Sequence, residues 1–312
     1  MIYTLTLNPA LDRTLTVEKL VPDETIRVIT EERYAAGKGI DVSRVIKELG
    51  GRSVALGFVG GYDGLELEGR LINDGVLSNF IRIAGNTRTN IILKERANGH
   101  QYVISAPGPH VSAHELSQLY QQIVSLPDMT YLVISGSIPP GLKPTVYGQF
   151  IMAAKAKGAM VALDADGEAM REGVRSGPDF IKPNLRELSR LVGRDLESEQ
   201  EIMEACDPLF NRGISIVMVS RGPQGILTVT HDEAYRCVPP RIKVQNTVGA
   251  GDSALAAFIL CYSRGGSLAE CTKRATAAGT ATAMAAGTAL ARHDDVEQLF
   301  HEVQLDTITR FR

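Results

Sequence analysis

Two glycines one residue apart, Gly249 and Gly251, stand directly before Asp252 and an apolar run of residues 254–260. The glycines allow a tight turn, and the run after them predicts a buried helix. Such a turn presents unpaired N–H groups at the positive end of a helix, where anions bind. A carboxylate there can accept a proton from an attacking hydroxyl while the amides of Gly249, Ala250 and Gly251 stabilise a transferred phosphoryl group. The motif indicates phosphoryl transfer, and the alternative is that Asp252 only caps the helix.

A second glycine-rich turn has Lys38 between Gly37 and Gly39, directly before a segment with apolar residues at helical spacing through residue 49. A lysine in a turn at a helix start suits a polar or phosphorylated ligand. The turn lacks the G-x-x-x-x-G-K-[ST] spacing of a P-loop. Taken alone, it is better explained as a loop and a helix cap.

Continuous apolar runs at residues 131–134, 160–163, 180–181 and 214–219 alternate with segments of helical pattern. This alternation predicts an α/β fold, in which a mainly parallel, doubly wound sheet is covered by helices on both faces. Polar or glycine residues follow each run, and the carboxyl ends of parallel strands form the ligand-binding edge of such sheets. We therefore expect an active site at this edge.

Asp164 and Asp166 are separated by one residue at the end of the run 160–163. A shared acid–base role for the two carboxylates is not expected. None of the six histidines has a partner at metal-ligand spacing, and we assign them to structural or surface positions.

Two further segments have apolar or β-branched residues interleaved with charges. Residues 14–34 predict short two-sided strands, and residues 87–94 alternate cleanly as a half-exposed strand. We expect the two segments to pair. A lid or a dimer flap is one use for such a piece, and an ordinary surface hairpin is the alternative.

Composition excludes several classes of protein. A chain of 312 residues with a formal net charge of −3 has no basic field for nucleic acid. The four cysteines form no C-x-x-C pair, which predicts buried thiols in a reducing compartment. Residues 2–7 predict a strand rather than a signal peptide, and residues 275–291 a packed core helix and loop rather than a membrane span. We expect a cytoplasmic protein that binds neither nucleic acid nor membrane.

The motif from Thr247 to Ser253 resembles the C-terminal signature of the PfkB (ribokinase-like) carbohydrate kinases. Gly-Lys-Gly-Ile-Asp-Val-Ser-Arg, residues 37–44, resembles the N-terminal sugar-binding signature of the same family, and the two stand in the family's order. The resemblance covers the whole chain. It implies one ribokinase-like kinase domain over residues 1–312, with lid strands from about 12–34 and 87–105, and ATP-dependent phosphorylation of a carbohydrate hydroxyl with Asp252 as the base.

The resemblance also implies roles for individual residues. The sugar phosphate would be held by Asp12, Gly37, Lys38, Gly39, Asp41, Arg88, Ser137 and Arg27. The nucleotide would contact Lys182, Asn184, Ser220, Gly222, Gly225, Thr247 and Thr280. Asn184 and Glu187 would orient Mg²⁺ indirectly, although their spacing alone is better explained as a helix cap. Residues 278–287 would form the adenine pocket and a monovalent-cation loop, and Ala285 and Ala289 stand where members of the family carry polar side chains.

Within the family, Leu-Asn-Pro-Ala-Leu-Asp and Thr-Arg-x-Asn resemble the hexose-phosphate (phosphofructokinase) branch. This implies conversion of fructose 6-phosphate or fructose 1-phosphate to fructose 1,6-bisphosphate, by a homodimer paired through the lid strands. One residue departs from the pattern, since Asp41 stands where the family has asparagine and lacks a donor for the sugar. A kinase for tagatose 6-phosphate, an unphosphorylated sugar or a nucleoside is the first alternative, and a non-catalytic binding module is the second.

Overall fold

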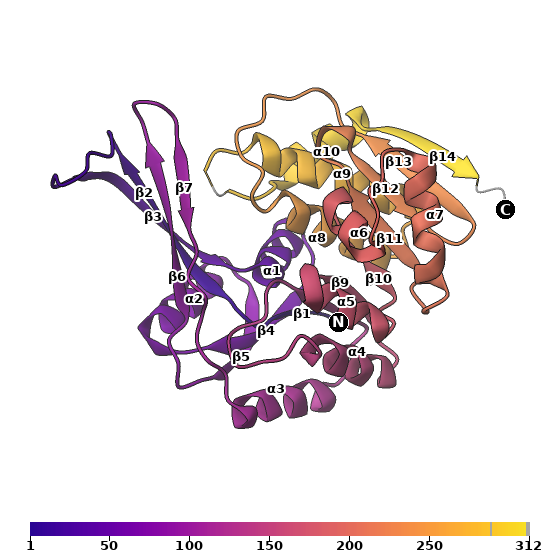
Figure 1. Cartoon of the computed structure of the whole chain (residues 1–312), viewed down its shortest axis with the longest axis horizontal. Coiled ribbons are helices and arrows are strands. Elements are labelled where there is room, and N and C mark those ends of the chain that lie inside the picture. The colour runs from indigo at the N-terminus through magenta and orange to yellow at the C-terminus, as the bar shows by residue number, and fades with distance from the viewer. Residues whose placement is uncertain (288, 310–312) are drawn as a thin grey trace.

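The structure is a computed structural model that describes residues 1–287 and 289–309. Its larger sheet is 10-stranded (Figure 1). From edge to edge the order is β14 (Gln304–Thr309), β13 (Glu233–Val238), β12 (Ile226–Val229), β11 (Ile216–Ser220), β10 (Phe180–Ile181), β9 (Met160–Asp164), β8 (Tyr131–Ser135), β1 (Ile2–Thr6), β4 (Ser53–Val59) and β5 (Leu77–Arg82). The strands from β5 to β11 are parallel, and β12 to β14 add an antiparallel edge. The predicted mainly parallel sheet is confirmed.

The chain reverses its progress across the sheet beside β1. It passes from β1 to β4 and β5 on one side, then returns to β8 on the other side. Ligands of open α/β sheets bind outside the carboxyl ends of the strands at such a switch point. Here the two strand ends are joined, because Asn8 Nδ2 donates to Ser137 Oγ at 3.2 Å. The topology therefore selects the region around Asn8 and Ser137.

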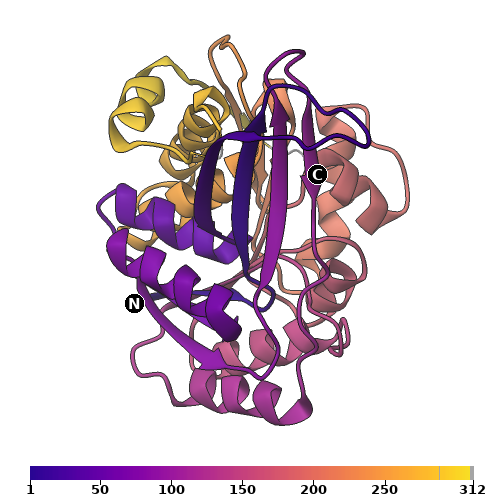
Figure 2. The same ribbon diagram turned by 90° about the vertical axis from the view of Figure 1, so that its left-hand side faces the viewer.

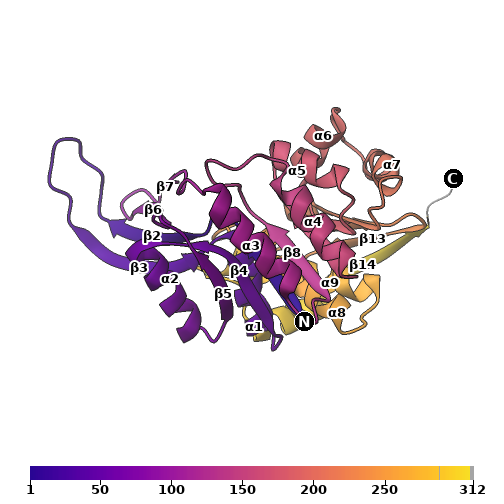
Figure 3. The same ribbon diagram turned by 90° about the horizontal axis from the view of Figure 1, so that it is seen from below.

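Helices cover both faces of the large sheet (Figure 3). One apolar cluster packs the sheet against α3 (Ala113–Ser125), α4 (Val146–Ala156), α5 (Gly167–Arg175), α6 (Leu185–Val192) and α7 (Glu199–Phe210). Other clusters pack the opposite face against α1 (Lys38–Glu48), α2 (Gly61–Asn73), α8 (Ala250–Ser263), α9 (Leu268–Met284) and α10 (His293–Glu302). This is the predicted doubly wound arrangement.

The start of α1 lies unusually close to β1. Thr4 and Thr6 are buried, and Thr4 Oγ1 lies 2.8 Å from Ser43 Oγ of α1. A Cβ atom at Gly39 would lie 2.5 Å from Thr6 Oγ1 and 3.1 Å from the Leu5 carbonyl oxygen. Only glycine allows this approach. The first turn of α1, which carries Lys38, is thereby held against the end of β1.

A separate 4-stranded sheet has the order β3 (Val28–Ala36), β2 (Ala10–Val17), β6 (Arg88–Glu95) and β7 (Gln101–Ile104). β2 pairs with β6 in parallel, which confirms the predicted pairing of the two segments, while β3 and β7 are antiparallel to their neighbours. Figure 2 shows this small sheet standing beside the helices of the main body. Its strands lead directly from β1 and into α1, so it borders the carboxyl edge of the large sheet.

Cys206, Cys237, Cys261 and Cys271 are buried and form no disulfide, as expected. The reducing compartment inferred from them stays a prediction. Within residues 1–287 and 289–309, no helix is both long and apolar enough to cross a membrane.

Candidate active site

Asp252 is the third residue of α8, at the carboxyl edge of the sheet. The helix begins after Gly249, whose φ of 79° is left-handed, and no side chain caps it. Asp252 is only 7% exposed. The alternative that Asp252 serves as the helix cap is therefore wrong. A buried carboxylate that makes no capping bond is suited to chemistry instead.

The amides before Asp252 are mostly available to a ligand. Among the described residues, the N–H groups of Gly249 and Gly251 meet no backbone or side-chain acceptor. The third predicted amide differs, because the Ala250 N–H donates to the Thr247 carbonyl at 3.3 Å and closes the turn. The prediction of three open amides is corrected to two, since the turn itself engages the middle one.

A buried carboxylate that sequence reasoning left without a role joins the two predicted lysines. Asp164, at the end of β9, is fully buried, and its Oδ1 and Oδ2 lie 3.1 Å from Lys38 Nζ and 3.1 Å from Lys182 Nζ. Lys182 Nζ is also 3.0 Å from the position that a Cβ of Gly251 would take. Asp166 is exposed and binds Arg190, so the expected separation of the two aspartates is confirmed.

These charges set the protonation of the site. Burial raises the pKa of Asp252 to about 6, the negative charge of Asp164 adds to the rise, and Lys38 and Lys182 oppose it. A general base works best when its pKa lies near the operating pH. Asp164 in turn raises the pKa of Lys38, which therefore stays positively charged. The site thus combines a carboxylate that can take up a proton with two fixed cations.

The predicted sugar-binding residues gather around the ends of β1 and β2. Asp12 accepts a hydrogen bond from Asn90 Nδ2 at 2.8 Å, and Arg88 donates to the carbonyls of Asn8 and Ala106 at 3.0 and 2.9 Å. Arg88 is therefore not a freely solvated surface charge. Asn8 and Asn90 position these groups, and their places in Leu-Asn-Pro and Thr-Arg-x-Asn were the available sequence signal.

Asp41 lies one turn into α1 with its side chain 16% exposed, and its Oδ1 accepts from Arg44 at 3.3 Å. Burial raises the pKa of Asp41 to about 8; Arg44 opposes the rise, while the negative charges of Asp252 and Asp12 add to it. Three carboxyl groups thus influence one another across the site. At neutral pH, Asp41 holds its proton.

Arg27 is the one predicted sugar-binding residue that the structure sets apart. It is exposed and directly precedes β3, whereas Gly37 and Lys38 directly follow that strand. A strand of nine residues spans about 26 Å between its ends. Within one chain Arg27 therefore does not join Lys38, and the sequence could not reveal this because the length of β3 was unknown.

Two of the predicted nucleotide-binding residues are joined directly. Asn184 and Ser220 form a parallel bridge, and Asn184 and Glu187 form a capping box at 2.9 and 2.8 Å. The cap interpretation is confirmed, and it engages one carboxylate oxygen of Glu187. Gly222 begins the short turn η1 (Gly222–Gln224) that precedes Gly225, Thr247 is exposed before α8, and Thr280 lies on α9.

Comparison with known proteins decides the family. Residues 6–295 match the family model described as pfkB family carbohydrate kinase. The chain belongs to the PfkB family. ATP-dependent 6-phosphofructokinase isozyme 2 of Escherichia coli is 36% identical over 96% of this chain and 97% of that protein. 1-Phosphofructokinase of Borreliella burgdorferi is 33% identical over 99% of both. The crystal structure of Escherichia coli phosphofructokinase-2 in complex with potassium has a TM-score of 0.92 and 36% identity, and covers 96% of this chain and 98% of that one.

As a PfkB kinase, the chain is a phosphotransferase that acts on a sugar hydroxyl and uses ATP. The available amides beside Lys182 fit this use, because N–H groups and an ammonium are what a nucleotide phosphate binds. Within the described residues, no three His, Cys, Asp or Glu side chains converge on a metal position. A magnesium ion would take its ligands chiefly from phosphates and water.

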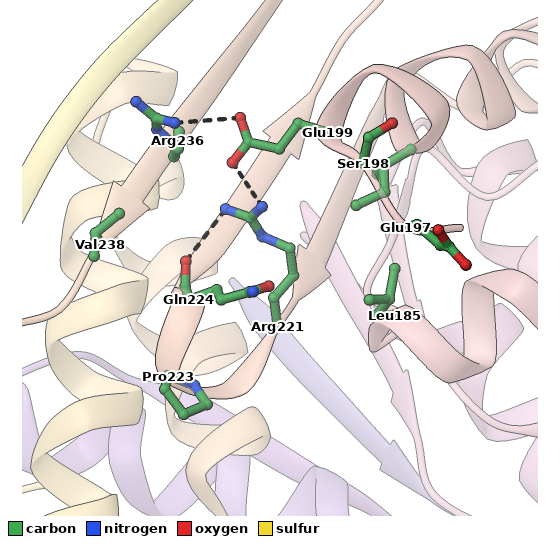
Figure 4. Close-up of a pocket in the computed structure, with 10 residues that line it drawn as sticks. Leu185, Glu197, Ser198, Glu199, Arg221, Pro223, Gln224, Arg236 and Val238 are labelled. Carbon is green, nitrogen blue, oxygen red and sulfur yellow. Dashed lines mark hydrogen bonds and ion pairs between the residues drawn. The ribbon is translucent and has the colours of Figure 1, made fainter. Parts of the chain in front are cut away.

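Ion pairs support the loop of residues 220–225, which is predicted to contact the nucleotide (Figure 4). Arg221 donates to Glu199 at 2.7 Å and to the Gln224 carbonyl at 3.2 Å, and Arg236 pairs with the same glutamate. Together with Pro223 they line a pocket that contains none of the predicted site residues.

Proposed function

We propose that this PfkB kinase phosphorylates a fructose monophosphate, fructose 6-phosphate or fructose 1-phosphate, to fructose 1,6-bisphosphate. The observation that carries the proposal is that Asp252, a buried carboxylate that makes no capping bond, lies within the electrostatic influence of two lysines that share one buried aspartate. Lys38 and Arg88 lie at the sugar end and would bind the substrate's own phosphate. The 6-phosphofructokinase and 1-phosphofructokinase relatives support this substrate class without selecting between its members.

In the proposed reaction, Asp252 takes the proton from the attacking sugar hydroxyl. The amides of Gly249 and Gly251 and the ammonium of Lys182 stabilise charge on the transferred phosphoryl group. Asp12, held by Asn90, and Gly37, Gly39 and Ser137 complete the sugar side. No covalent enzyme intermediate is needed, because the residues only position the reactants and stabilise charge.

The nucleotide side would be formed by Lys182, Asn184, Ser220, Gly222, Gly225, Thr247 and Thr280. Magnesium would neutralise phosphate charge when bound, and Asn184 and Glu187 would orient its water ligands. A monovalent cation would bind near residues 278–287, and the potassium complex of the Escherichia coli relative supports this. Ala285 and Ala289 offer such a cation backbone carbonyls only.

Asp41 replaces the family's asparagine, and its protonation removes the apparent conflict with an anionic substrate. With a pKa of about 8, Asp41 is neutral at pH 7 and its O–H group can donate to a sugar oxygen, as an amide would. Above that pKa it becomes an anion beside a phosphate. We therefore propose that sugar-phosphate binding weakens at alkaline pH.

A coupled ADP-release screen tests the substrate. The panel is fructose 6-phosphate, fructose 1-phosphate, tagatose 6-phosphate, fructose and a nucleoside, each at about pH 7 and about pH 9. We expect a fructose phosphate to give the highest kcat/KM, with a KM that rises several-fold at the higher pH. A preference for fructose or the nucleoside would overturn the phosphate-binding roles of Lys38 and Arg88 and favour the alternative that Asp41 supports.

We further propose that one kinase domain spans the chain and dimerises through the small sheet. Val28 and Ile29 of β3 and Val103 and Ile104 of β7, the two edge strands of the small sheet, are 46–61% exposed. An open sheet with exposed apolar side chains tends to pair with another chain. A second copy of this chain is the occupant that presents the same surface.

Sedimentation velocity tests the dimer. The Ile104→Asp variant places a charge in the proposed interface and is expected to be monomeric where the unmodified chain is dimeric. Met152→Asp, on α4 and 58% exposed, is the matched control and should leave the dimer intact. A dimer that survives Ile104→Asp would contradict this interface.

A further inference from the structure

Asp164 bridges two lysines that come from different parts of the fold. Lys38 begins α1 beside the sugar end of the site, whereas Lys182 follows β10 beside the amides of α8. Each lysine lies 3.1 Å from its own oxygen of the one carboxylate. The carboxylate is fully buried, and the side chains of Lys38 and Lys182 are 39% and 6% exposed. A single buried group thus fixes the separation of two cations.

Stability alone does not explain this arrangement. One ammonium neutralises a buried carboxylate, and a buried ion pair contributes little net stability over an apolar replacement. A second lysine leaves an excess positive charge, and that excess faces Asp252, whose pKa both lysines lower. The charges of Asp164 and Asp252 thus balance those of Lys38 and Lys182. Of these four groups, only Asp252 has no ion-pair partner among the described residues.

We propose that Asp164 is a positioning residue that holds Lys38 on the acceptor side and Lys182 on the donor side of the transferred phosphoryl group, and thereby sets the charge around the base Asp252. The proposal rests on the assignment of Asp252 as base. It assigns Asp164 no contact with either substrate. Its effect reaches the reaction through the two lysines and through its own negative charge.

The electrostatics of the site agree with this role. Four charged groups influence the pKa of Asp252: Asp164 of β9, Lys38 and Asp41 of α1, and Lys182 after β10. The charges of Asp12 and Arg44 in turn shift the pKa of Asp41, and the charge of Glu187 shifts that of Lys38. Asp164 raises the pKa of Asp252, and both lysines lower it. Removing Asp164 should therefore lower the pKa of Asp252, and removing Lys38 should raise it.

The test compares kcat against pH for the unmodified chain, Asp164→Asn and Lys38→Met with saturating ATP and sugar phosphate. For Asp164→Asn we expect a kcat about 10²-fold lower, because misplacement of charged groups by about 1 Å costs this much. We also expect the acidic limb of its kcat–pH profile, where Asp252 becomes protonated, to move to lower pH by about one unit. For Lys38→Met the limb should move up, and in the double variant it should return toward its original position. The substrate phosphate titrates alike in every variant, so only the differences between limbs are read.

Asp166→Asn is the matched control, since Asp166 follows the same strand but is exposed, and its limb should not move. A purely structural role for Asp164 would lower activity without moving the limbs in opposite directions, and that result would overturn the proposal. Full activity of Asp164→Asn would also overturn it. If Asp252→Asn is inactive and the acidic limb of Asp164→Asn is not shifted, only the positioning role of Asp164 is rejected. If Asp252→Asn is active, both that role and the assignment of Asp252 as base are rejected. If Asp164→Asn does not fold, the test rests on Lys38→Met, and an acidic limb that does not move in this variant contradicts the role proposed for Asp164.

Discussion

Asp252→Asn is expected to lower kcat by about 10²- to 10⁴-fold, the usual contribution of a general base. The amide has nearly the shape of the carboxylate but cannot take the proton of the sugar hydroxyl. ADP binding, measured by calorimetry, should change little, because no charge attraction to the nucleotide is lost. Removal of the negative charge beside the phosphates should favour binding slightly.

Asp295 provides the matched control for this substitution. It is also the third residue of its helix, α10, but it is exposed and none of the predicted site residues lies on that helix. Asp295→Asn should retain full activity. Near-normal turnover by Asp252→Asn would rule out the base assignment and would leave the non-catalytic binding module as the better account of the site.

Gly249→Ala is expected to lower kcat by about 10²-fold, the scale of losing a well-placed oxyanion donor. The φ of Gly249 is 79°, and an added Cβ would lie 2.5 Å from Leu290 Cδ2. The turn must move to relieve that contact, and the amides of Gly249 and Gly251 move with it. Steady-state kinetics measure the loss of kcat, and denaturant unfolding measures the loss of stability.

Gly265→Ala is the control that distinguishes the effect of backbone strain from the effect of displacing the amides. Gly265 follows the other end of α8, its φ is 83°, and an added Cβ meets nothing within 4 Å. Gly265→Ala and Gly249→Ala should share a destabilisation of about 1–2 kcal/mol from the left-handed backbone. Only Gly249→Ala should lose kcat. Equal kcat in the two variants would show that the turn does not present the amides to the phosphoryl group.

The backbone conformation of the two glycine-rich turns and the helix starts after them could be predicted because each is local. The residues that shape the turn, the residue that follows it and the helix start lie within a few positions in the sequence, so their geometry follows from backbone conformation. The fold class was accessible for a similar reason, since continuous apolar runs separated by helices fit few arrangements other than a covered parallel sheet.

The role of Asp164 could not be predicted, because it depends on contacts between distant segments. Lys38 is 126 positions from Asp164, and no pattern around either residue reports the pairing. Asp164 and Asp166 are separated because β9 ends at Asp164 and Asp166 caps α5, and the sequence could not say which of the two faces the site. The distance of Arg27 from Lys38 could not be predicted either, because it depends on the length of β3, and the sequence did not define where that strand begins and ends.

The connection between the small sheet and α1 has a mechanical consequence. β3 ends at Ala36 and α1 begins at Lys38, so a single glycine separates them. The small sheet is therefore linked through one residue to Lys38, whereas Asp252 belongs to α8, which packs against α1 in one apolar cluster. A displacement of the small sheet would thus reach Lys38 after one residue but Asp252 only through the packing of two helices.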